Sequence, residues 1–464
     1  MAANKPTLLR QLGVVSATAL VVSNMIGTGI FTSTGFLAGQ LGSPSLVLWS
    51  WVVGAIAAFI GAICYAELGV NFPSSGGEYV YLTRAFGPTW GFMTGWASFF
   101  AGFSAPIASV ALAFSGYLGY FDPRFRPENA HVLIGSGEWT LQFGWAQVVA
   151  CALVAGFTIL NLLGIQRAAR VQNVLTALKV TVLAAFVAFA FWFGQGDLAN
   201  FTRNAVRTVS TPLAGQFAIS MVWVYVAYSG WNAATYVAEE LRQPTRTLPV
   251  ALAIGTALVA VLYIVLNVVF IYAAPLEDMK DRLAVGAFAA SRLFGPQVAG
   301  VFSALMALSL MATVNAMVTI GPRVYYAMAK NRAFPAAAAR VHPKWHTPVP
   351  AILAQAVCTM LMTMTPFPQL VVYIGITLNF FAVMSVASLF SFRRKPGWQK
   401  LPLVSFCYPL FPVLFLIVGA WMTFYGIQLK PVISLAAIVT VATGALFYHA
   451  RWKSRTEAPA VETY

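Results

Sequence analysis

The stretch NMIGTGIF, residues 24 to 31, lies in the middle of the first long apolar segment of the chain, which runs from about residue 12 to residue 41. About 20 apolar residues in a helix cross the hydrocarbon of a bilayer, so this segment is long enough to span a membrane. Its centre nevertheless holds Gly27, Thr28 and Gly29, and glycine destabilises the interior of a helix. The sequence therefore predicts a helix that is interrupted halfway across the membrane.

The whole chain has the composition of an integral membrane protein. It has 464 residues, of which 59% are hydrophobic and 9% are charged, and its mean hydropathy is +0.76. Soluble domains carry about 25% charged residues. The apolar segments are continuous and lack the alternation typical of membrane β-barrels. We therefore expect an all-α, multi-pass protein of the cell (cytoplasmic) membrane.

Twelve apolar segments are expected to form twelve transmembrane helices. Their approximate bounds are 13–40, 45–70, 87–119, 143–163, 171–194, 213–240, 248–273, 297–329, 349–364, 367–392, 406–429 and 431–450. An even number of spans places both chain termini on the same side of the membrane. The residues between the third and fourth spans form the longest loop on the other side.

The basic residues indicate which side that is. The net charge is +15, and Lys and Arg gather on the cytoplasmic side of membrane proteins. Most of the 28 basic residues fall at the N-terminus, in alternate loops and at the C-terminus: Lys5, Arg10, Arg84, Arg167, Arg170, Arg242, Arg246, Arg323, Lys330, Arg332, Arg340, Lys344, Arg393, Arg394, Lys395, Lys400, Arg451, Lys453 and Arg455. We therefore expect a cytoplasmic N-terminus (1–11) and a cytoplasmic tail (451–464).

A second interruption lies in the sixth span. VAYSGWN, residues 226 to 232, places Ser229 and Gly230 in the middle of an apolar helix. This span follows the first by five and would cross the membrane in the opposite direction. Matched breaks of opposite orientation indicate an inverted repeat of five plus five helices. The expected halves are residues 12–194 and 195–392, followed by two accessory helices in residues 393–450.

Breaks in two helices at this depth have a chemical use. An interrupted helix exposes backbone N–H and C=O groups, which are tolerated in the membrane where they line a cavity. A half-helix that starts after the break directs N–H groups and a positive dipole end at the cavity, and one that ends there directs carbonyls. Together they suit the carboxylate and ammonium of an α-amino acid. The alternative is that the glycines serve close helix packing.

Four stretches resemble one known family: MIGTGIF (25–31), CYAELGVNFPSSGGEYVYL (64–82), YSGWNAATYVAEEL (228–241) and RVYYAMAKNRAFP (323–335). The chain, over roughly residues 12–450, resembles the amino acid–polyamine–organocation superfamily, and especially its L-type amino acid transporters and their bacterial relatives. The resemblance implies a LeuT-like fold. It also implies a sodium-independent exchanger or facilitator that carries neutral L-amino acids by alternating access.

The resemblance also implies the residues of the site. Backbone N–H groups and the Thr28 hydroxyl would bind the substrate carboxylate, and carbonyls of Ile26 and Val226 would bind its ammonium. Several relatives carry a large aromatic residue in place of Val226, so either the pocket accepts a different side chain or another residue, such as Trp223 or Tyr228, is the gate. Neither break contains an acidic residue, which disfavours cationic substrates. The implied substrate-binding residues are Ile26, Gly27, Thr28, Gly29, Ile30, Val226, Ala227, Ser229 and Gly230, with Met25 as a further candidate.

Lys179 lies inside the fifth apolar segment, and an ionisable residue there is usually functional. The alternative is a lysine that extends to the membrane surface. By the resemblance, its ammonium replaces a sodium ion, bonding carbonyls of the first break and Thr313 on the eighth span. This arrangement predicts sodium-independent transport. A Lys179 that changes protonation would instead favour a proton-coupled symporter.

Four acidic residues near the cytoplasmic side have separate interpretations. Glu239 and Glu240, close to Arg242 and Arg246, form either a gate or a plain charge cluster. Glu67 is expected to make structural hydrogen bonds near the inner end of the second span. Glu78 is expected in the short cytoplasmic segment between the second and third spans, after a tight turn.

Other classes of protein are disfavoured. In HPKWHT (342–347), Pro343 between the two histidines and Pro348 after them argue against a helix, and no Cys or carboxylate lies beside them, so no metal site or cofactor is expected. No nucleotide-binding or hydrolase motif appears, which argues against an enzyme. The four cysteines lie in or near spans and none lies in the loop before the fourth span, so we expect no disulfide-linked ancillary subunit. The basic residues are explained by the cytoplasmic loops, so no nucleic acid partner is expected. A non-transporting amino acid sensor remains an alternative because it would share the same site.

Overall fold

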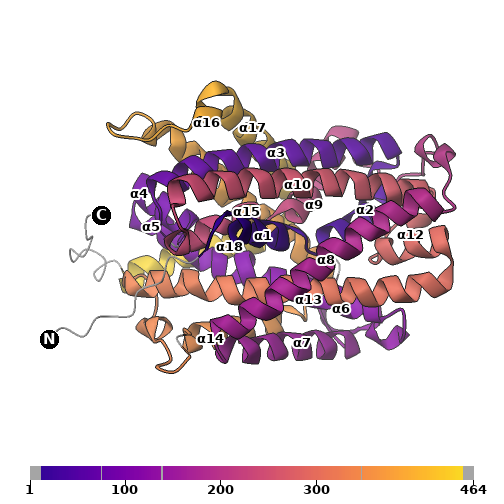
Figure 1. The fold of residues 1–464 in the computed structure, drawn as a ribbon, viewed down its shortest axis with the longest axis horizontal. Helices are drawn as coiled ribbons and strands as arrows, with labels where there is room; N and C mark the ends of the chain where they lie inside the picture. The colour runs from indigo at the N-terminus through magenta and orange to yellow at the C-terminus, as the bar shows by residue number, and fades with distance from the viewer. Residues whose placement is uncertain (1–11, 75, 137–138, 346, 453–464) are drawn as a thin grey trace.

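The computed structural model of the chain describes residues 12–452 apart from residues 75, 137–138 and 346, and it is mainly helical (Figure 1). The first predicted half contains α1 (Val14–Met25), α2 (Gly29–Leu41), α3 (Pro44–Asn71), α4 (Glu78–Phe86), α5 (Pro88–Ala97), the π-helical segment η1 (Ser98–Ser104), α6 (Ala105–Leu118), α7 (Trp145–Leu162) and α8 (Ile165–Phe193).

The remaining chain adds further helices of the same kind. They are α9 (Leu213–Tyr228), the 3-10 segment η5 (Ala233–Glu240), α10 (Pro244–Ala273), α11 (Leu276–Met279), α12 (Val285–Phe294), α13 (Pro296–Lys330), α14 (Val349–Met362), α15 (Phe367–Phe392), α16 (Pro402–Phe406), α17 (Leu410–Leu429) and α18 (Pro431–Phe447). Proline at the first helical turn is well tolerated because no N–H is needed there, and it opens many of these helices.

The expected fold class is confirmed. Within the described residues, 11 helical segments are long and apolar enough to cross a membrane. The predicted ninth span is a shorter helix, α14, of 14 residues. Both predicted interruptions are present, since α1 ends at Met25 before α2 starts at Gly29, and α9 ends at Tyr228 before the 3-10 segment η5.

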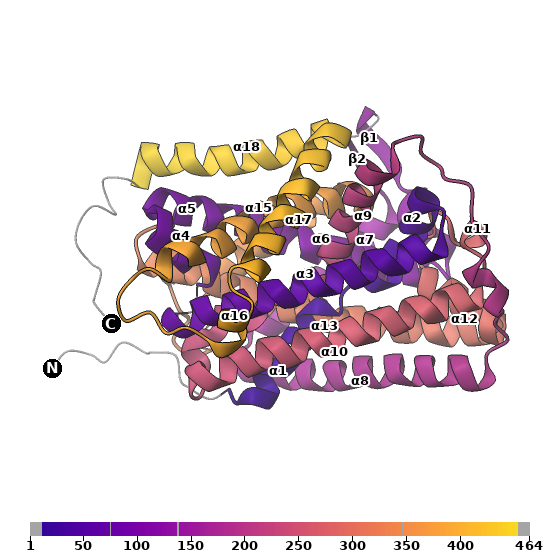
Figure 2. The same ribbon diagram turned by 90° about the horizontal axis from the view of Figure 1, so that it is seen from above.

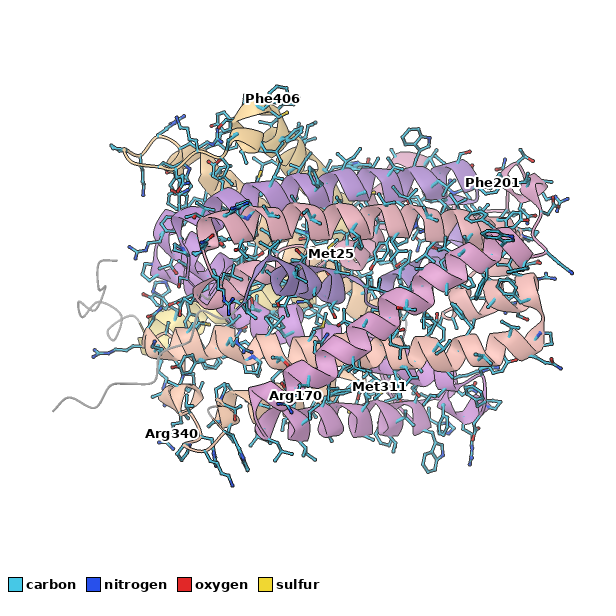
Figure 3. All side chains as sticks on the ribbon, in the orientation of Figure 1. Met25, Arg170, Phe201, Met311, Arg340 and Phe406 are labelled. Atoms are coloured by element: carbon cyan, nitrogen blue, oxygen red, sulfur yellow. The ribbon has the colours of Figure 1, made fainter. Side chains whose placement is uncertain are left out.

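The long helices lie side by side, roughly along the long axis of the molecule (Figures 1 and 2). Figure 3 labels Arg340 at one end of this axis, Phe201 at the other and Met25 near the middle. We call these the Arg340 end and the Phe201 end. The first break, which follows Met25, therefore lies about halfway along the axis, as expected for a site at the membrane midplane.

The sequence did not predict the only sheet in the described part of the chain. The segment between α6 and α7 contains an antiparallel hairpin of β1 (His131–Ser136) and β2 (Trp139–Phe143). We expected an irregular loop here. The hairpin is anchored outside itself, because the Gln142 amide donates a 2.7 Å hydrogen bond to the Met364 carbonyl.

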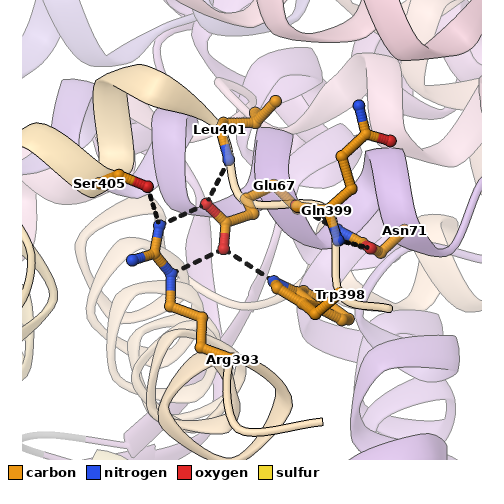
Figure 4. A network of polar contacts seen from close by, with 7 residues as sticks. All are labelled: Glu67, Asn71, Arg393, Trp398, Gln399, Leu401 and Ser405. Atoms are coloured by element: carbon orange, nitrogen blue, oxygen red, sulfur yellow. Dashed lines mark hydrogen bonds and ion pairs between the residues drawn. The ribbon is translucent and has the colours of Figure 1, made fainter. Parts of the chain in front are cut away.

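A buried ion pair fixes the C-terminal end of α3 (Figure 4). The Glu67 carboxylate is fully buried and accepts two hydrogen bonds from the Arg393 guanidinium, at 2.7 and 2.6 Å. It also accepts from Trp398 Nε1 at 2.8 Å and from the Leu401 amide at 3.0 Å. These bonds satisfy the carboxylate and tie α3 to the segment that joins α15 to α17, which is the structural role expected for Glu67.

Candidate functional site

The first break presents backbone donors. Thr28 caps α2 and makes no side-chain capping hydrogen bond. The first N–H groups of a helix have no partner within that helix, so those of Gly29 and Ile30 are available to a ligand. Thr28, Gly29 and Ile30 are buried at the middle of the molecule. This geometry can bind an anion such as a carboxylate.

The second break lies directly against the first. Gly230 has a φ of +102°, which favours glycine, and a Cβ there would lie 2.9 Å from the Asn24 carbonyl carbon. A Cβ on Gly29 would overlap Ala227. The glycines therefore permit close packing between the breaks, so the packing interpretation and the site interpretation are both compatible with this geometry.

Lys179 on α8 is fully buried, and its side chain reaches the end of α1 and α13. Its ammonium donates to the Ile26 carbonyl at 2.6 Å, to Thr313 Oγ1 at 2.7 Å and to the Ser23 carbonyl at 3.4 Å. The Thr313 hydroxyl in turn donates to Ile26 at 2.9 Å. The structure thus brings together Lys179, Thr313 and the first break, and Lys179 does not extend to the surface.

These bonds also limit which carbonyls remain for a substrate. The Ile26 carbonyl accepts from both Lys179 and Thr313, and the Val226 carbonyl accepts from the Ser229 amide at 3.1 Å and hydroxyl at 2.7 Å. Each carbonyl oxygen has two lone pairs, so both are already satisfied in this conformation. An ammonium group that binds there would have to share them or displace a bond.

Tyr263 on α10 is a residue of the site that sequence reasoning missed. Its hydroxyl lies 2.6 Å from the Met25 carbonyl and 3.3 Å from the Ala227 carbonyl, so a single donor faces both breaks. One turn along α10, Asn267 accepts from Thr34 of α2. Two polar residues one turn apart in an otherwise apolar span were the available signal.

A polar network extends from the lysine along α8. Gln172 donates to Ser23 Oγ at 2.7 Å and accepts from Asn315 of α13 at 2.9 Å. Asn315 also accepts from Asn161 of α7 at 3.1 Å. These side chains connect α1, α7, α8 and α13 through buried hydrogen bonds, which fix the position of α8 and so of Lys179.

A cavity of about 60 Å³ adjoins both breaks. Its walls include Asn24 before the first break, Ser229 and Gly230 at the second, and the aromatic residues Phe103, Tyr225, Trp231 and Tyr236. Glu78, the first residue of α4, also lines it and is 5% exposed. Neither break itself contains an acidic residue, but the fold brings Glu78 at the start of α4 to the second break, where it accepts from Asn232 at 3.3 Å.

The candidate gate residues separate into two groups. Trp223 stacks on Phe36 of α2, with ring centroids 4.5 Å apart, one turn before the second break. Tyr228 instead packs against α3 and donates to the Trp51 carbonyl at 3.2 Å. The two candidate gate residues therefore contact different helices, α2 and α3. Glu239 accepts from Ser74 at 3.3 Å, and the side chain of Glu240 lies outside the described residues.

Comparison with known proteins assigns the chain to a family. Residues 12–446 match the model of the amino acid permease family, which is nearly the whole chain. The chain belongs to the amino acid permease family. It is therefore a multi-pass membrane protein and a transporter, not an enzyme.

Individual relatives are of moderate similarity. The permease is 31% identical over 458 residues to the large neutral amino acids transporter small subunit 2 of Mus musculus, covering 95% of this chain and 81% of the relative. It is 28% identical to the Asc-type amino acid transporter 1 of the same species, covering 98% and 84%. It is 26% identical to the serine/threonine exchanger SteT of Bacillus subtilis (strain 168), covering 88% and 89%.

Proposed function

We propose that this permease exchanges or facilitates the passage of neutral L-amino acids, without sodium, by alternating access around the two breaks. The observation that carries the proposal is the contact of the two interrupted helices at mid-depth, where the uncapped start of α2 lies against the second break and a cavity lined by Asn24, Ser229 and Gly230 adjoins them. The printed names of the relatives support the substrate class, since they describe neutral amino acid and serine/threonine transporters.

The substrate would be held by its backbone atoms. The N–H groups after Thr28 and the Thr28 hydroxyl bind the carboxylate, where the positive end of α2 stabilises a negative charge. Carbonyls at Ile26 and Val226 are the proposed ammonium acceptors once their present bonds rearrange. Met25, Gly27, Ala227, Ser229 and Gly230 complete the proposed pocket.

The absence of a sodium requirement is inferred from Lys179. Its ammonium supplies a positive charge to the Ser23 and Ile26 carbonyls and to Thr313, which are oxygen ligands of the kind that a hard cation binds. A fixed ammonium at this point leaves no need for a dissolved cation. The backbone of the first break therefore keeps the same conformation whether or not sodium is present.

The orientation follows from charge. We propose that the Arg340 end is cytoplasmic, because the end of α13 and the segment after it carry Arg323, Lys330, Arg332 and Arg340. The two halves of the inverted repeat, residues 12–194 and 195–392, then cross the membrane in opposite directions. No cysteine lies in the segment between α6 and α7, residues 119–142, and we propose that the permease works without a disulfide-linked subunit.

Uptake of labelled amino acids into proteoliposomes tests this function. We expect uptake of neutral amino acids that is unchanged when sodium is replaced by choline and that is stimulated by internal amino acid. Loss of uptake in choline would contradict the role of Lys179. Uptake that requires a pH gradient would favour proton symport, and binding without flux would indicate a sensor.

A further inference from the structure

The cavity beside the breaks contains one buried carboxyl group whose role is not explained by the proposed binding of substrate backbone atoms. Glu78 Oε1 accepts from the Tyr65 hydroxyl at 2.6 Å and from Asn232 Nδ2 at 3.3 Å. Both donors are neutral, so neither balances the carboxylate charge. Within the described residues, Glu78 forms no ion pair, and no Lys, Arg or His lines the cavity.

An unpaired buried carboxylate is costly to maintain. The fully buried Glu67 shows the usual solution, because it is paired with Arg393. Removing a charge from water without a partner disfavours the folded protein, and such groups usually pair or bind a ligand. Glu78 is therefore distinguished from Glu67 because it has a cavity on one side and no cationic partner in the part of the chain that the structure describes.

The cavity has the chemistry of an ammonium site. Aromatic faces attract cations, and four aromatic residues, Phe103, Tyr225, Trp231 and Tyr236, form its walls around the carboxylate. Its volume of about 60 Å³ exceeds what one water molecule needs. The cavity contacts Ser229 and Gly230, and α4 lies toward the Arg340 end, so an amino acid leaving the breaks in that direction would pass Glu78.

We propose that Glu78 forms a subsite for the α-ammonium group of the transported amino acid on the Arg340 side of the two breaks. This inference rests on the transport function proposed above. The subsite would hold the amino acid at its last step before release toward the Arg340 end, and at its first step after entry from there. It would not contribute to binding from the Phe201 end.

Glu78→Gln is the sharpest test, because the amide oxygen can still accept from Tyr65 and Asn232 while the charge is lost. Exchange would be measured in right-side-out and inside-out membrane vesicles loaded with alanine. We expect the variant to raise the KM for alanine at least about tenfold at the face where Glu78 lies and less than about twofold at the other. Glu128→Gln, an exposed carboxylate in the segment between α6 and α7, is the matched control.

Each result is decisive for the subsite. An equal change in both orientations, or none, would overturn it. Glu78→Gln could instead weaken the inhibition of alanine exchange by added lysine and leave the KM for alanine unchanged. That result would also overturn the subsite, because Glu78 would then recognise a cationic side chain. The absence of exchange by the unmodified permease would instead contradict the proposed function.

The pH dependence of the unmodified permease gives a second test that does not need a folded variant. Burial raises the pKa of the Glu78 carboxyl to about 7, although the bonds from Tyr65 and Asn232 lower it. The titratable groups that face it are tyrosines, Tyr65, Tyr81, Tyr225 and Tyr236, which are neutral near pH 7.

The sign follows from these charges. Below about pH 7 the carboxyl is protonated and loses its attraction for the ammonium, while the zwitterion keeps its charges. We expect the KM for alanine to rise at the Glu78 face as the pH there falls from 8 to about 6, and to stay constant at the other face. A KM that is independent of pH at both faces would overturn the subsite.

Discussion

Two side chains hold the breaks in place by hydrogen bonds to backbone carbonyls. Lys179 of α8 donates to the Ile26 carbonyl of the first break and to Thr313 of α13. Tyr263 of α10 faces both breaks. Carbonyl groups freed by an interrupted helix need donors in an environment that excludes water. The same residues that stabilise the irregular backbone therefore also set the shape of the substrate site.

Lys179→Ala is expected to impair transport far more than folding. It removes a charged donor from the Ile26 carbonyl, and hydrogen bonds to charged groups contribute roughly 1.5–3 kcal/mol each. We predict a loss of exchange of about 100-fold or more, with a protein that still elutes as a single peak and keeps most of its thermal stability in detergent. Lys400→Ala, in an exposed loop, is the control, and normal flux in Lys179→Ala would remove the lysine from the mechanism.

Tyr263→Phe isolates the hydroxyl group that faces both breaks. The ring would keep its contacts with Trp51 and Tyr228. We predict about tenfold slower exchange because the Met25 and Ala227 carbonyls lose their donor, at a cost in stability of roughly 1–2 kcal/mol. The matched variant Tyr272→Phe, whose hydroxyl bonds Gly194 outside the site, should exchange normally. Equal rates in both variants would contradict a role of Tyr263 at the breaks.

At the scale of elements, the two interrupted helices depend on glycine for their contact. Gly29 begins α2 and lies against Ala227 near the end of α9. Backbone atoms of the two breaks therefore approach more closely than a side chain would permit. Trp223 of α9 stacks on Phe36 of α2 beside this contact, and the cavity with Glu78 adjoins the second break.

Gly29→Ala should separate the breaks, because the added methyl overlaps Ala227. We predict loss of amino acid binding and a lower melting temperature, since overpacking costs about 1–3 kcal/mol. Gly156→Ala in α7 is the matched control, because a Cβ there meets no atom within 4 Å. Alanine in that helix should be neutral or stabilise by up to about 1 kcal/mol. Scintillation-proximity binding and thermal unfolding measure both, and unchanged binding by Gly29→Ala would refute the close contact.

For the whole molecule, segments far apart in the chain are joined by buried polar contacts. Glu67 and Arg393 join α3 to the segment after α15, and the network around Gln172 and Asn315 joins α8 to α13. In a membrane these contacts add to packing between apolar helices, for which water provides no driving force. They set the positions of the helices against which the breaks must move.

The ion pair of Glu67 and Arg393 can be tested by a double-mutant cycle. Removing one partner of a buried pair leaves the other charge unpaired and costs about 3–5 kcal/mol. We predict that Glu67→Ala and Arg393→Ala each lower the melting temperature strongly, while the double variant is less destabilised than the sum of the two. Thermal unfolding in detergent measures this, and purely additive effects would show that the two side chains do not act as a pair.

The sequence by itself determined the membrane class, the positions of both breaks and the buried lysine. These follow from local composition, because the thickness of the bilayer sets the length of an apolar helix and makes glycine or lysine within it conspicuous. The hairpin between α6 and α7 was missed because the predicted loop carries only weak local signals.

Only the tertiary structure decided which side chains reach the breaks. Tyr263 faces Met25 across 238 residues of chain, and the α4 segment brings Glu78 to Asn232 across 154. The polar residues of α10 mark that span as unusual, but nothing beside Tyr263 or Glu78 names its partner, because hydrogen bonds between distant segments depend on how the helices pack. The chemistry of the breaks could therefore be read from the sequence, whereas the side chains that surround them required the folded molecule.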